Sequence, residues 1–395
     1  MKKFFFYFVM WSLTFAACFA MIEYGFGAFY YSNVDQVSNK SFDDVLGWTL
    51  KPGRYWVKPP HSYKKHEVYV NEFGLRDIER DELPPETERQ LIILGDSFTY
   101  GSLVGTEDIF PTHMNDILND QHVDRYSVIN TGVPGYGSAQ QLLLLKKLSN
   151  AGITADAYLL MLFTNDILDN LRLNYDDLTT NSSQPGYVLD NAGTLDLKYY
   201  PQLRTGNEST TFVPVNKQRG RTKVTQVVSR QIEGFLQTRP ALIGALGKVG
   251  IEVEFPRMPG LINGWYNDVV LDPGLPLMAA LIGEINNEVE KAGGQLLVSM
   301  IPSSLQIYPD TYSDMLTRTF PNSEEVNQWI NDKAKPQRLV LEICRDLDVP
   351  YLDLYPVLLA RNDEDLFIPR DGHFTKEGHK VVAASLAGFI NEHVE

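Results

Sequence analysis

The chain has 395 residues, which suffices for one large domain or two modest ones, and its hydrophobic fraction of 44% permits a substantial core. The formal net charge of −15 argues against nucleic acid as a partner, because a phosphate backbone repels an acidic surface. Cys18 lies in an apolar N-terminal segment far from Cys344, so we expect no disulfide, and no Cys or His spacing indicates a metal site.

The N-terminus has the pattern of a membrane-targeting segment. It begins Met-Lys-Lys and continues with nineteen uncharged residues, Phe4 to Ile22. As a helix this run would be about 28 Å long, close to the hydrocarbon thickness of a bilayer. The two lysines favour a cytoplasmic N-terminus. We therefore expect residues 1–31 to hold an uncleaved anchor; a cleaved signal peptide or a lipoprotein signal ending at Cys18 are the alternatives. All three place the remaining chain outside the cytoplasm.

A polar segment and a large domain follow. Residues 32–69 contain three prolines and are expected to form an extracytoplasmic stalk. Residues 70–395 are expected to form the domain, which starts with the sequence VNEFGLRD. Arg76 in this stretch is expected to anchor it to the domain through an ion pair, without a catalytic role.

From Leu91 onward, apolar strands alternate with helical segments. The expected strands lie at 91–94, 126–130, 157–163, 295–301 and 350–354, and the expected helices at 138–149, 276–292, 325–346 and Thr375 to about Asn391. Strands that alternate with helices predict an α/β fold with a parallel sheet covered on both faces.

Residues 171–276 break this alternation and are expected to form a long insertion between the third and fourth strands. The sequence predicts a hairpin at 186–197 and a helical stretch at 224–237. Because the insertion starts just after the third strand, it must leave the sheet at the edge that carries the candidate site. We expect its tyrosines to border the substrate; the alternative is that they cover a small core of the insertion itself.

A candidate nucleophile follows the first strand. The stretch Ile93–Gly101 reads ILGDSFTYG and places Asp96 and Ser97 at the carboxyl end of that strand. Open α/β sheets bind ligands and perform their chemistry at this edge. Ser97 is therefore a candidate nucleophile. The alternative is structural, because Ser and Asp also cap the first turns of helices.

A serine hydroxyl needs a base to take its proton, and two histidines near the C-terminus compete for this role. His373 comes two residues after Asp371, whose carboxylate would orient the imidazole and stabilise its protonated form. His379 lies in the early turns of the last predicted helix and ranks second. The alternative for Asp371 and His373 is that they cap this helix at the surface.

Acyl transfer also needs hydrogen-bond donors for the developing oxyanion. Gly132 follows the second strand and would let its backbone N–H approach a ligand closely. Asn165 follows the third strand and could donate from its side-chain amide. Glycine and asparagine are also common in ordinary loops. The argument for both residues is their position, since each follows a strand at the same sheet edge as Ser97.

These residues resemble the sequence blocks of the SGNH/GDSL hydrolases. The four blocks occur in the order of the family, as Gly95-Asp96-Ser97, Gly132, Asn165-Asp166 and Asp371-x-His373. The resemblance covers about Val70 to the C-terminus, apart from the insertion. It implies a three-layer α/β/α sandwich with a parallel, flavodoxin-like sheet.

The resemblance also implies a role for each residue. Ser97 would be the nucleophile, His373 its base and Asp371 the group that orients the base. The N–H groups of Ser97 and Gly132 and the amide of Asn165 would form the oxyanion hole. Such a site works through an acyl-enzyme and needs neither a metal nor an organic cofactor.

The sequence departs from the family pattern at two positions. Phe163 stands where the third block commonly has glycine, and Asp371 and His373 are two residues apart instead of three. The shorter spacing is similar to that of extracytoplasmic polysaccharide O-acetyltransferases within the superfamily.

We therefore expect a membrane-anchored, extracytoplasmic serine esterase that cleaves O-acyl esters, O-acetyl esters included. Its substrate would be an acylated small molecule, lipid or glycan. The alternatives are an O-acyltransferase that acts on cell-surface polysaccharide, and a binding protein that kept the fold and lost the activity.

Overall fold

The computed structural model describes residues 39–57, 65–76, 89–121, 126–171, 176–177, 182–202, 259–369 and 371–394, together with Tyr7, Trp11 and Thr14. Apart from these last three positions, they belong to one unit of the chain, which spans residues 38–206 and 258–395. The rest of the predicted anchor, Phe4–Ile22, and the helix expected at 224–237 lie outside the described residues. None of the described helices combines the length and the apolar character needed to cross a membrane.

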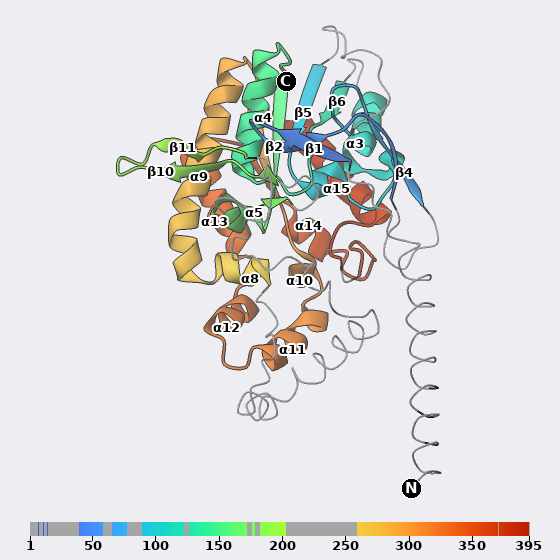
Figure 1. Cartoon of the computed structure of the whole chain (residues 1–395), viewed down its shortest axis with the longest axis vertical. Coiled ribbons are helices and arrows are strands. Elements are labelled where there is room, and N and C mark those ends of the chain that lie inside the picture. The colour runs from blue at the N-terminus through green and yellow to red at the C-terminus, as the bar shows by residue number, and fades with distance from the viewer. Residues whose placement is uncertain are drawn as a thin grey trace. The chain divides into compact units, whose positions relative to one another are not determined.

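A five-stranded parallel sheet forms the centre of the domain (Figure 1). Its strands are β5 (Arg89–Leu94), β6 (Tyr126–Asn130), β7 (Ala157–Phe163), β12 (Gln295–Ile301) and β13 (Tyr351–Asp353). Their order in the sheet is β13-β12-β7-β5-β6, the flavodoxin-like order. All five predicted strands are present. The order of connection reverses between β5 and β7, and a crevice forms at the carboxyl ends of strands at such a point.

Helices cover both faces of the sheet. On one face, α4 (Ser138–Asn150), α9 (Asp268–Lys291) and α13 (Lys335–Asp346) pack on side chains such as Ile92 and Leu160. On the other face, α3 (Phe110–Gln121) and α15 (Lys376–His393) pack on the alternate side chains of the same strands. Figure 1 shows α4 and α9 on one side of the sheet and α3 and α15 on the other. The prediction of a three-layer α/β/α sandwich is thereby confirmed.

Shorter elements connect these layers. They are η1 (Thr106–Asp108), α2 (Ser97–Tyr100), α5 (Asp166–Leu171), β8 (Asp176–Asp177), β9 (Ser182–Ser183), α8 (Gly260–Trp265), α10 (Ser304–Ile307), α11 (Pro309–Thr319), α12 (Glu324–Asn331) and α14 (Tyr355–Leu359).

Two helices differ from their predicted bounds. The helix expected at 325–346 is divided into α12 and α13, because Asp332 leaves the helical conformation and Pro336, in the first turn of α13, has no N–H to donate to a preceding turn. The helix expected at 276–292 begins earlier, at Asp268, and contains two prolines near its start.

The segment expected to form a stalk is folded onto the domain wherever it is described. It forms two antiparallel pairs, β1 (Lys40–Asp43) with β2 (Gly47–Leu50) and β3 (Gly53–Val57) with β4 (His66–Val70). Trp48 is fully buried, and its carbonyl accepts a hydrogen bond of 2.5 Å from the Tyr136 hydroxyl. The stalk prediction is wrong here. It was based on the prolines of this segment, whereas the apolar side chains of β2 and β4 pack on the domain. The compact unit starts at residue 38, not 70.

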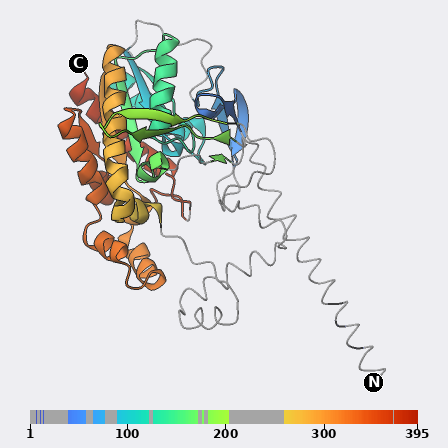
Figure 2. The same cartoon turned by 60° about the vertical axis from the view of Figure 1, so that its left-hand side comes forward.

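The described parts of the insertion also belong to the domain. The hairpin predicted at 186–197 is present as β10 (Gly186–Leu189) and β11 (Leu195–Tyr199), and it lies against α9 (Figure 2). The insertion was expected to end at residue 276, but α9 continues through this position without a break, so no structural boundary lies there.

Candidate active site

The turn after β5 presents Ser97. Asp96 caps helix α2, because its Oδ1 accepts a hydrogen bond of 2.8 Å from the Phe98 N–H. Ser97 is therefore the first residue of the helix and not its cap. A Cβ at Gly95 would lie 2.0 Å from Thr99 Oγ1, so only glycine fits there. The sequence Gly-Asp-Ser thus encodes a tight turn that leaves the serine hydroxyl available.

Ser97, His373 and Asp371 form a continuous chain of hydrogen bonds. Ser97 Oγ lies 2.8 Å from His373 Nε2, and His373 Nδ1 lies 2.6 Å from Asp371 Oδ1. Asp371 Oδ1 also accepts the backbone N–H of His373 at 3.2 Å. Gly372 adopts a φ of 91°, which lets the two side chains meet although they are only two residues apart in sequence. With Nδ1–H donating to the carboxylate, Nε2 is left to accept the serine proton.

The environment of Asp371 favours its ionised form. Burial alone raises its pKa, but the hydrogen bond and the charge of His373 outweigh this effect and hold the pKa below its ordinary value. Asp371 therefore carries a negative charge at neutral pH. It can hold the imidazole in one orientation and stabilise the imidazolium.

His379, the second candidate base, lies elsewhere in the fold. It is buried in α15, where its Nδ1 accepts a hydrogen bond of 3.1 Å from the Phe110 N–H. Burial and nearby cationic groups lower the pKa of His379 well below its ordinary value. This histidine is a neutral core residue, so the geometry supports His373 as the base.

Phe98 packs against the imidazole of His373, and two further phenylalanines pack on Phe98. The ring of Phe98 lies 4.9 Å from the His373 ring and 4.9 Å from that of Phe374. Phe163, which stands where the third block commonly has glycine, packs on Phe98 with ring centroids 4.2 Å apart. Phe163 therefore packs on the ring that contacts His373, and the hydrogen bonds that join Ser97, His373 and Asp371 are present in spite of this departure from the family pattern.

Gly132 lies near the nucleophile, but its N–H is directed elsewhere. The loop after β6 is held beside the Ser97 turn, since the Val133 N–H donates to Gly95 O at 3.3 Å. A Cβ at Gly132 would lie 2.3 Å from Tyr100 N, so glycine allows this close approach. The Gly132 N–H itself donates to Asn130 Oδ1 at 2.9 Å. Glycine is therefore required for packing at this position, and the predicted place of Gly132 in the oxyanion hole stays a prediction.

Asn165 is held in place by an acid on the next helix. Its Nδ2 donates to Asp169 Oδ2 at 2.7 Å, which uses one of the two amide hydrogens. The second hydrogen is left for another acceptor. This arrangement is compatible with the predicted oxyanion donor, and Asp169 is a supporting residue that the sequence analysis did not identify.

Two further acids of the site were also missed. Asp96 and Asp166 adjoin Ser97 and Asn165 in sequence, and their side chains are 2% and 0% exposed. Both belong to the blocks Gly-Asp-Ser and Asn-Asp. The motifs therefore contained both acids, but the sequence of a short motif does not predict that a carboxyl group is buried.

Arg76 anchors its segment differently from the prediction. The guanidinium is fully buried and donates to the carbonyls of Tyr100, Gly101 and Val104. Burial lowers the pKa of Arg76 to about 10. The anchor is thus a set of backbone hydrogen bonds at the end of α2, which fixes the helix that starts with Ser97.

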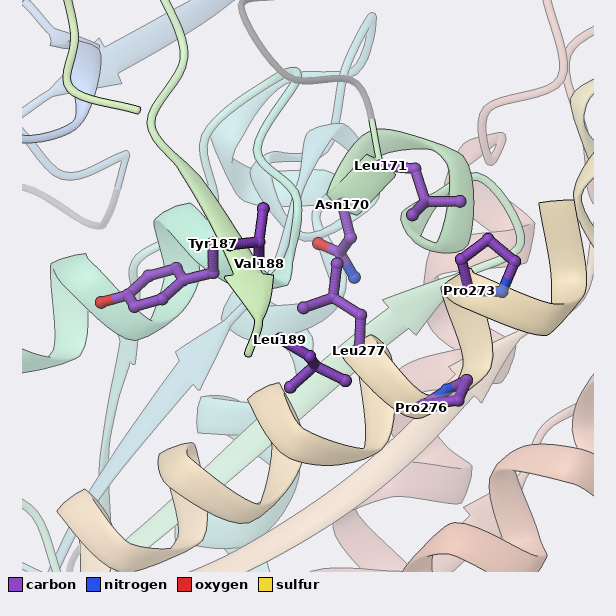
Figure 3. A pocket seen from close by; sticks show the side chains of 8 residues that line it. All are labelled: Asn170, Leu171, Tyr187, Val188, Leu189, Pro273, Pro276 and Leu277. Carbon is purple, nitrogen blue, oxygen red and sulfur yellow. The ribbon is translucent and has the colours of Figure 1, made fainter. Parts of the chain in front are cut away.

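A mainly apolar cavity lies between the insertion hairpin, α5 and α9 (Figure 3). Its volume is about 280 Å³, and it is lined by Asn170, Leu171, Tyr187, Val188, Leu189, Pro273, Pro276 and Leu277. Tyr187 is only 7% exposed and packs within the core cluster that includes α9. Its ring is therefore part of the domain interior, whereas Tyr200 is exposed. That the hairpin borders a substrate stays a prediction.

Comparison with known proteins supports the sequence resemblance. Residues 266–395 match the model of a family described as "SGNH hydrolase-like domain, acetyltransferase AlgX". This segment contains Asp371 and His373 but not Ser97. No curated protein matches the chain.

Several solved structures are similar at low identity. They include a lipase/acylhydrolase from Enterococcus faecalis (11% identity, TM-score 0.39, 78% of this chain and 97% of that chain), the acetyl xylan esterase AlAXEase (15%, 0.34, 76% and 98%) and the psychrotrophic esterase EstA from Pseudoalteromonas sp. (11%, 0.35, 77% and 98%). The family match confirms the resemblance to SGNH hydrolases over residues 266–395, the segment that contains the last of the four blocks.

Proposed function

We propose that this chain cleaves O-acyl esters through an acyl-enzyme on Ser97, with water as the final acceptor. The observation that carries the proposal is the hydrogen-bonded chain from Ser97 through His373 to Asp371. This geometry is what nucleophilic catalysis by a serine requires, because a base lies within reach of the hydroxyl and an acid orients the base. An intact triad also argues against a binding protein without activity.

In the first half of the reaction, Ser97 Oγ attacks the ester carbonyl carbon while His373 Nε2 takes the hydroxyl proton. The tetrahedral intermediate collapses, and the bond to the leaving alcohol breaks. The alcohol oxygen receives the proton from His373 and departs, which leaves the acyl group on Ser97. In the second half, water gives a proton to His373 and attacks the acyl carbon. The bond from this carbon to Ser97 Oγ then breaks, Ser97 Oγ takes the proton back from His373, and the acid product leaves.

Two donors are proposed for the oxyanion. The Ser97 N–H lies at the start of α2, where backbone N–H groups have no partner within the helix. Asn165 would supply the amide hydrogen that Asp169 does not use. Donors of this kind stabilise the negative charge that develops on the carbonyl oxygen.

A sugar hydroxyl in place of water would make the chain an O-acyltransferase. The family match favours this second candidate, since its description names an acetyltransferase. The two-residue spacing of Asp371 and His373 is similar to that of polysaccharide O-acetyltransferases and points the same way. The acyl-enzyme is common to both candidates, and only the acceptor differs.

One experiment separates them. The purified chain would be incubated with a small acetyl ester, with and without an unacetylated glycan, and both free acetate and acetylated glycan would be measured. An esterase releases acetate at the same rate in both reactions. A transferase acetylates the glycan at the expense of acetate release. If the wild-type chain forms no more acetate and no more acetylated glycan than Ser97→Ala does, both candidates are contradicted.

We further propose that the domain works outside the cytoplasm, tethered by Phe4–Ile22. The support is the length of the uncharged run and the two preceding lysines. The native protein should stay in the membrane fraction after an alkaline wash and keep its N-terminus. A mature chain that starts at or after Cys18 would contradict the tether and favour a cleaved signal.

A further inference from the structure

Two buried carboxyl groups lie behind the proposed catalytic residues. Asp96 directly precedes Ser97, and Asp166 directly follows Asn165. They follow the ends of adjacent parallel strands, since β5 pairs with β7 and Leu94 lies opposite Leu160. Both side chains are almost fully excluded from solvent. Burial of two acids is costly unless each is neutralised or hydrogen-bonded, so their protonation needs an explanation.

Each carboxyl group has one satisfied oxygen and one orphan. Asp96 Oδ1 accepts from the Phe98 N–H at 2.8 Å, and Asp166 Oδ2 accepts from the Phe163 N–H at 2.7 Å. Asp96 Oδ2 and Asp166 Oδ1 are buried and have no hydrogen-bond partner within the described part of the chain. A proton shared between Asp166 Oδ1 and Asp96 Oδ2 would give both oxygens a hydrogen-bond partner.

The charges around the two acids differ. His373 and the Ser97 hydroxyl favour the ionised form of Asp96, whereas the charges of Asp96 and Asp169 disfavour the ionised form of Asp166. Burial raises the pKa of Asp96 to about 6, and the hydrogen bond from the Phe98 N–H and the charge of His373 limit this rise. Burial and the charge of Asp96 raise the pKa of Asp166 well above its ordinary value. At neutral pH, Asp96 is therefore the ionised member and Asp166 the protonated one.

We propose that Asp166 holds a proton on Oδ1 and donates it to Asp96 Oδ2, so that the two acids form a positioning pair behind the catalytic serine. The bond ties the Ser97 turn to the Asn165 turn. It also leaves one negative charge near His373, which stabilises the imidazolium formed when Ser97 loses its proton. This catalytic consequence rests on the proposed function; the shared proton itself does not.

Substitutions of Asp166 test the catalytic consequence. Asp166→Ala removes the donor and leaves Asp96 unpaired, so kcat for a small ester should fall about 100-fold as the serine turn loses its position. Asp166→Asn supplies an amide N–H in place of the carboxyl O–H and should recover most of that loss. If folded Asp166→Asn protein is as impaired as Asp166→Ala, the protonated state of Asp166 is contradicted.

Asp353→Asn is the matched control for these variants. Asp353 ends β13 and accepts the N–H of Tyr355 at 2.8 Å, as Asp96 does with Phe98, but no second acid is among the groups that influence it. This substitution should leave kcat unchanged.

Infrared spectroscopy tests the proton without using activity. A protonated carboxyl group has a carbonyl stretch that carboxylates lack, and Ser97→Ala protein labelled with ¹³C-aspartate should show this band at pH 8. The band should disappear when Asp166→Asn is added and persist when Asp353→Asn is added. A spectrum without the band, or a band that survives Asp166→Asn, would overturn the pair even if the esterase proposal held.

Discussion

The carboxyl ends of β5 and β13 share one local structure, but they differ in their position in the sheet and in the burial of their aspartates. Each strand ends near an aspartate that accepts the N–H two residues later at 2.8 Å, and a short helix follows each. β5 lies inside the sheet between β6 and β7, whereas β13 is an edge strand paired only with β12. Asp96 is buried and interacts electrostatically with His373 and Asp166, and Asp353 is only half-buried.

This difference shows that the site comes from topology more than from the local motif. The loops after β5, β6 and β7 emerge side by side at the point where the strand order reverses. The turn after β5 makes hydrogen bonds to the Gly132 loop and to His373, whereas the Asp353 carboxylate after β13 makes a local one with the Tyr355 N–H. The following predictions test whether chemistry is confined to the β5 end.

The largest effect is expected at the nucleophile. Ser97→Ala should lower ester turnover about 10⁴-fold or more, because loss of a triad member removes nucleophilic catalysis. Asp353→Asn, at the β13 end, should leave kcat within error of the wild type. Steady-state kinetics on a small acetyl ester, with circular dichroism to confirm folding, checks both. Comparable losses in the two variants would mean that the strand ends are not functionally distinct.

The two C-terminal histidines should separate activity from stability. His373→Ala should resemble Ser97→Ala in turnover, because it removes the base. His379→Ala should destabilise the fold by about 2 kcal/mol, since it leaves the buried Phe110 N–H without its acceptor. Denaturant unfolding and kcat measured on both variants give the comparison. The reverse ranking of their turnover would identify His379 as the base.

A smaller loss is expected at the oxyanion donor. Asn165→Ala should reduce kcat about 10² to 10³-fold with little change in KM, since the donor acts on charge that exists only in the transition state. Gly132 is no clean control, because any side chain there would displace α2. Asn130→Ala is more suitable: it removes the acceptor of the Gly132 N–H, and a loss as large as that of Asn165→Ala would contradict the assignment.

The smallest effect concerns the pH dependence of stability. The pKa of Asp96 is about 6 in the folded chain and 3.8 when unperturbed, so the folded state holds the proton more tightly. The free energy of unfolding should therefore fall as pH rises from about 4 to about 6, by about 1 to 3 kcal/mol. Asp96→Asn should flatten this slope, whereas Asp353→Asn should change it less. An unchanged slope in Asp96→Asn would show that Asp96 titrates normally.

Most of the fold and the triad were predictable from the sequence because both rest on local patterns. Continuous apolar runs marked all five sheet strands, which are buried on both faces. Ser97 and His373 stood at the ends of predicted elements, where parallel topology brings residues together. These inferences need only the order of elements along the chain.

The errors arose where contacts between distant residues decide the structure. The segment around Trp48 looked like a stalk because its partners, such as Tyr136, lie far along the chain. The pairing of Asp96 with Asp166 depends on the adjacency of β5 and β7, which two adjacent letters do not reveal.

The most direct test of the central claim is to find the atom that becomes acylated. The full chain would be treated with a fluorophosphonate, or quenched with acid during turnover of an acetyl ester, and the adduct located by peptide mass spectrometry. The account predicts a single adduct on Ser97 that is absent in Ser97→Ala and strongly reduced in His373→Ala. An adduct on another residue, or labelling that persists in Ser97→Ala, would contradict it.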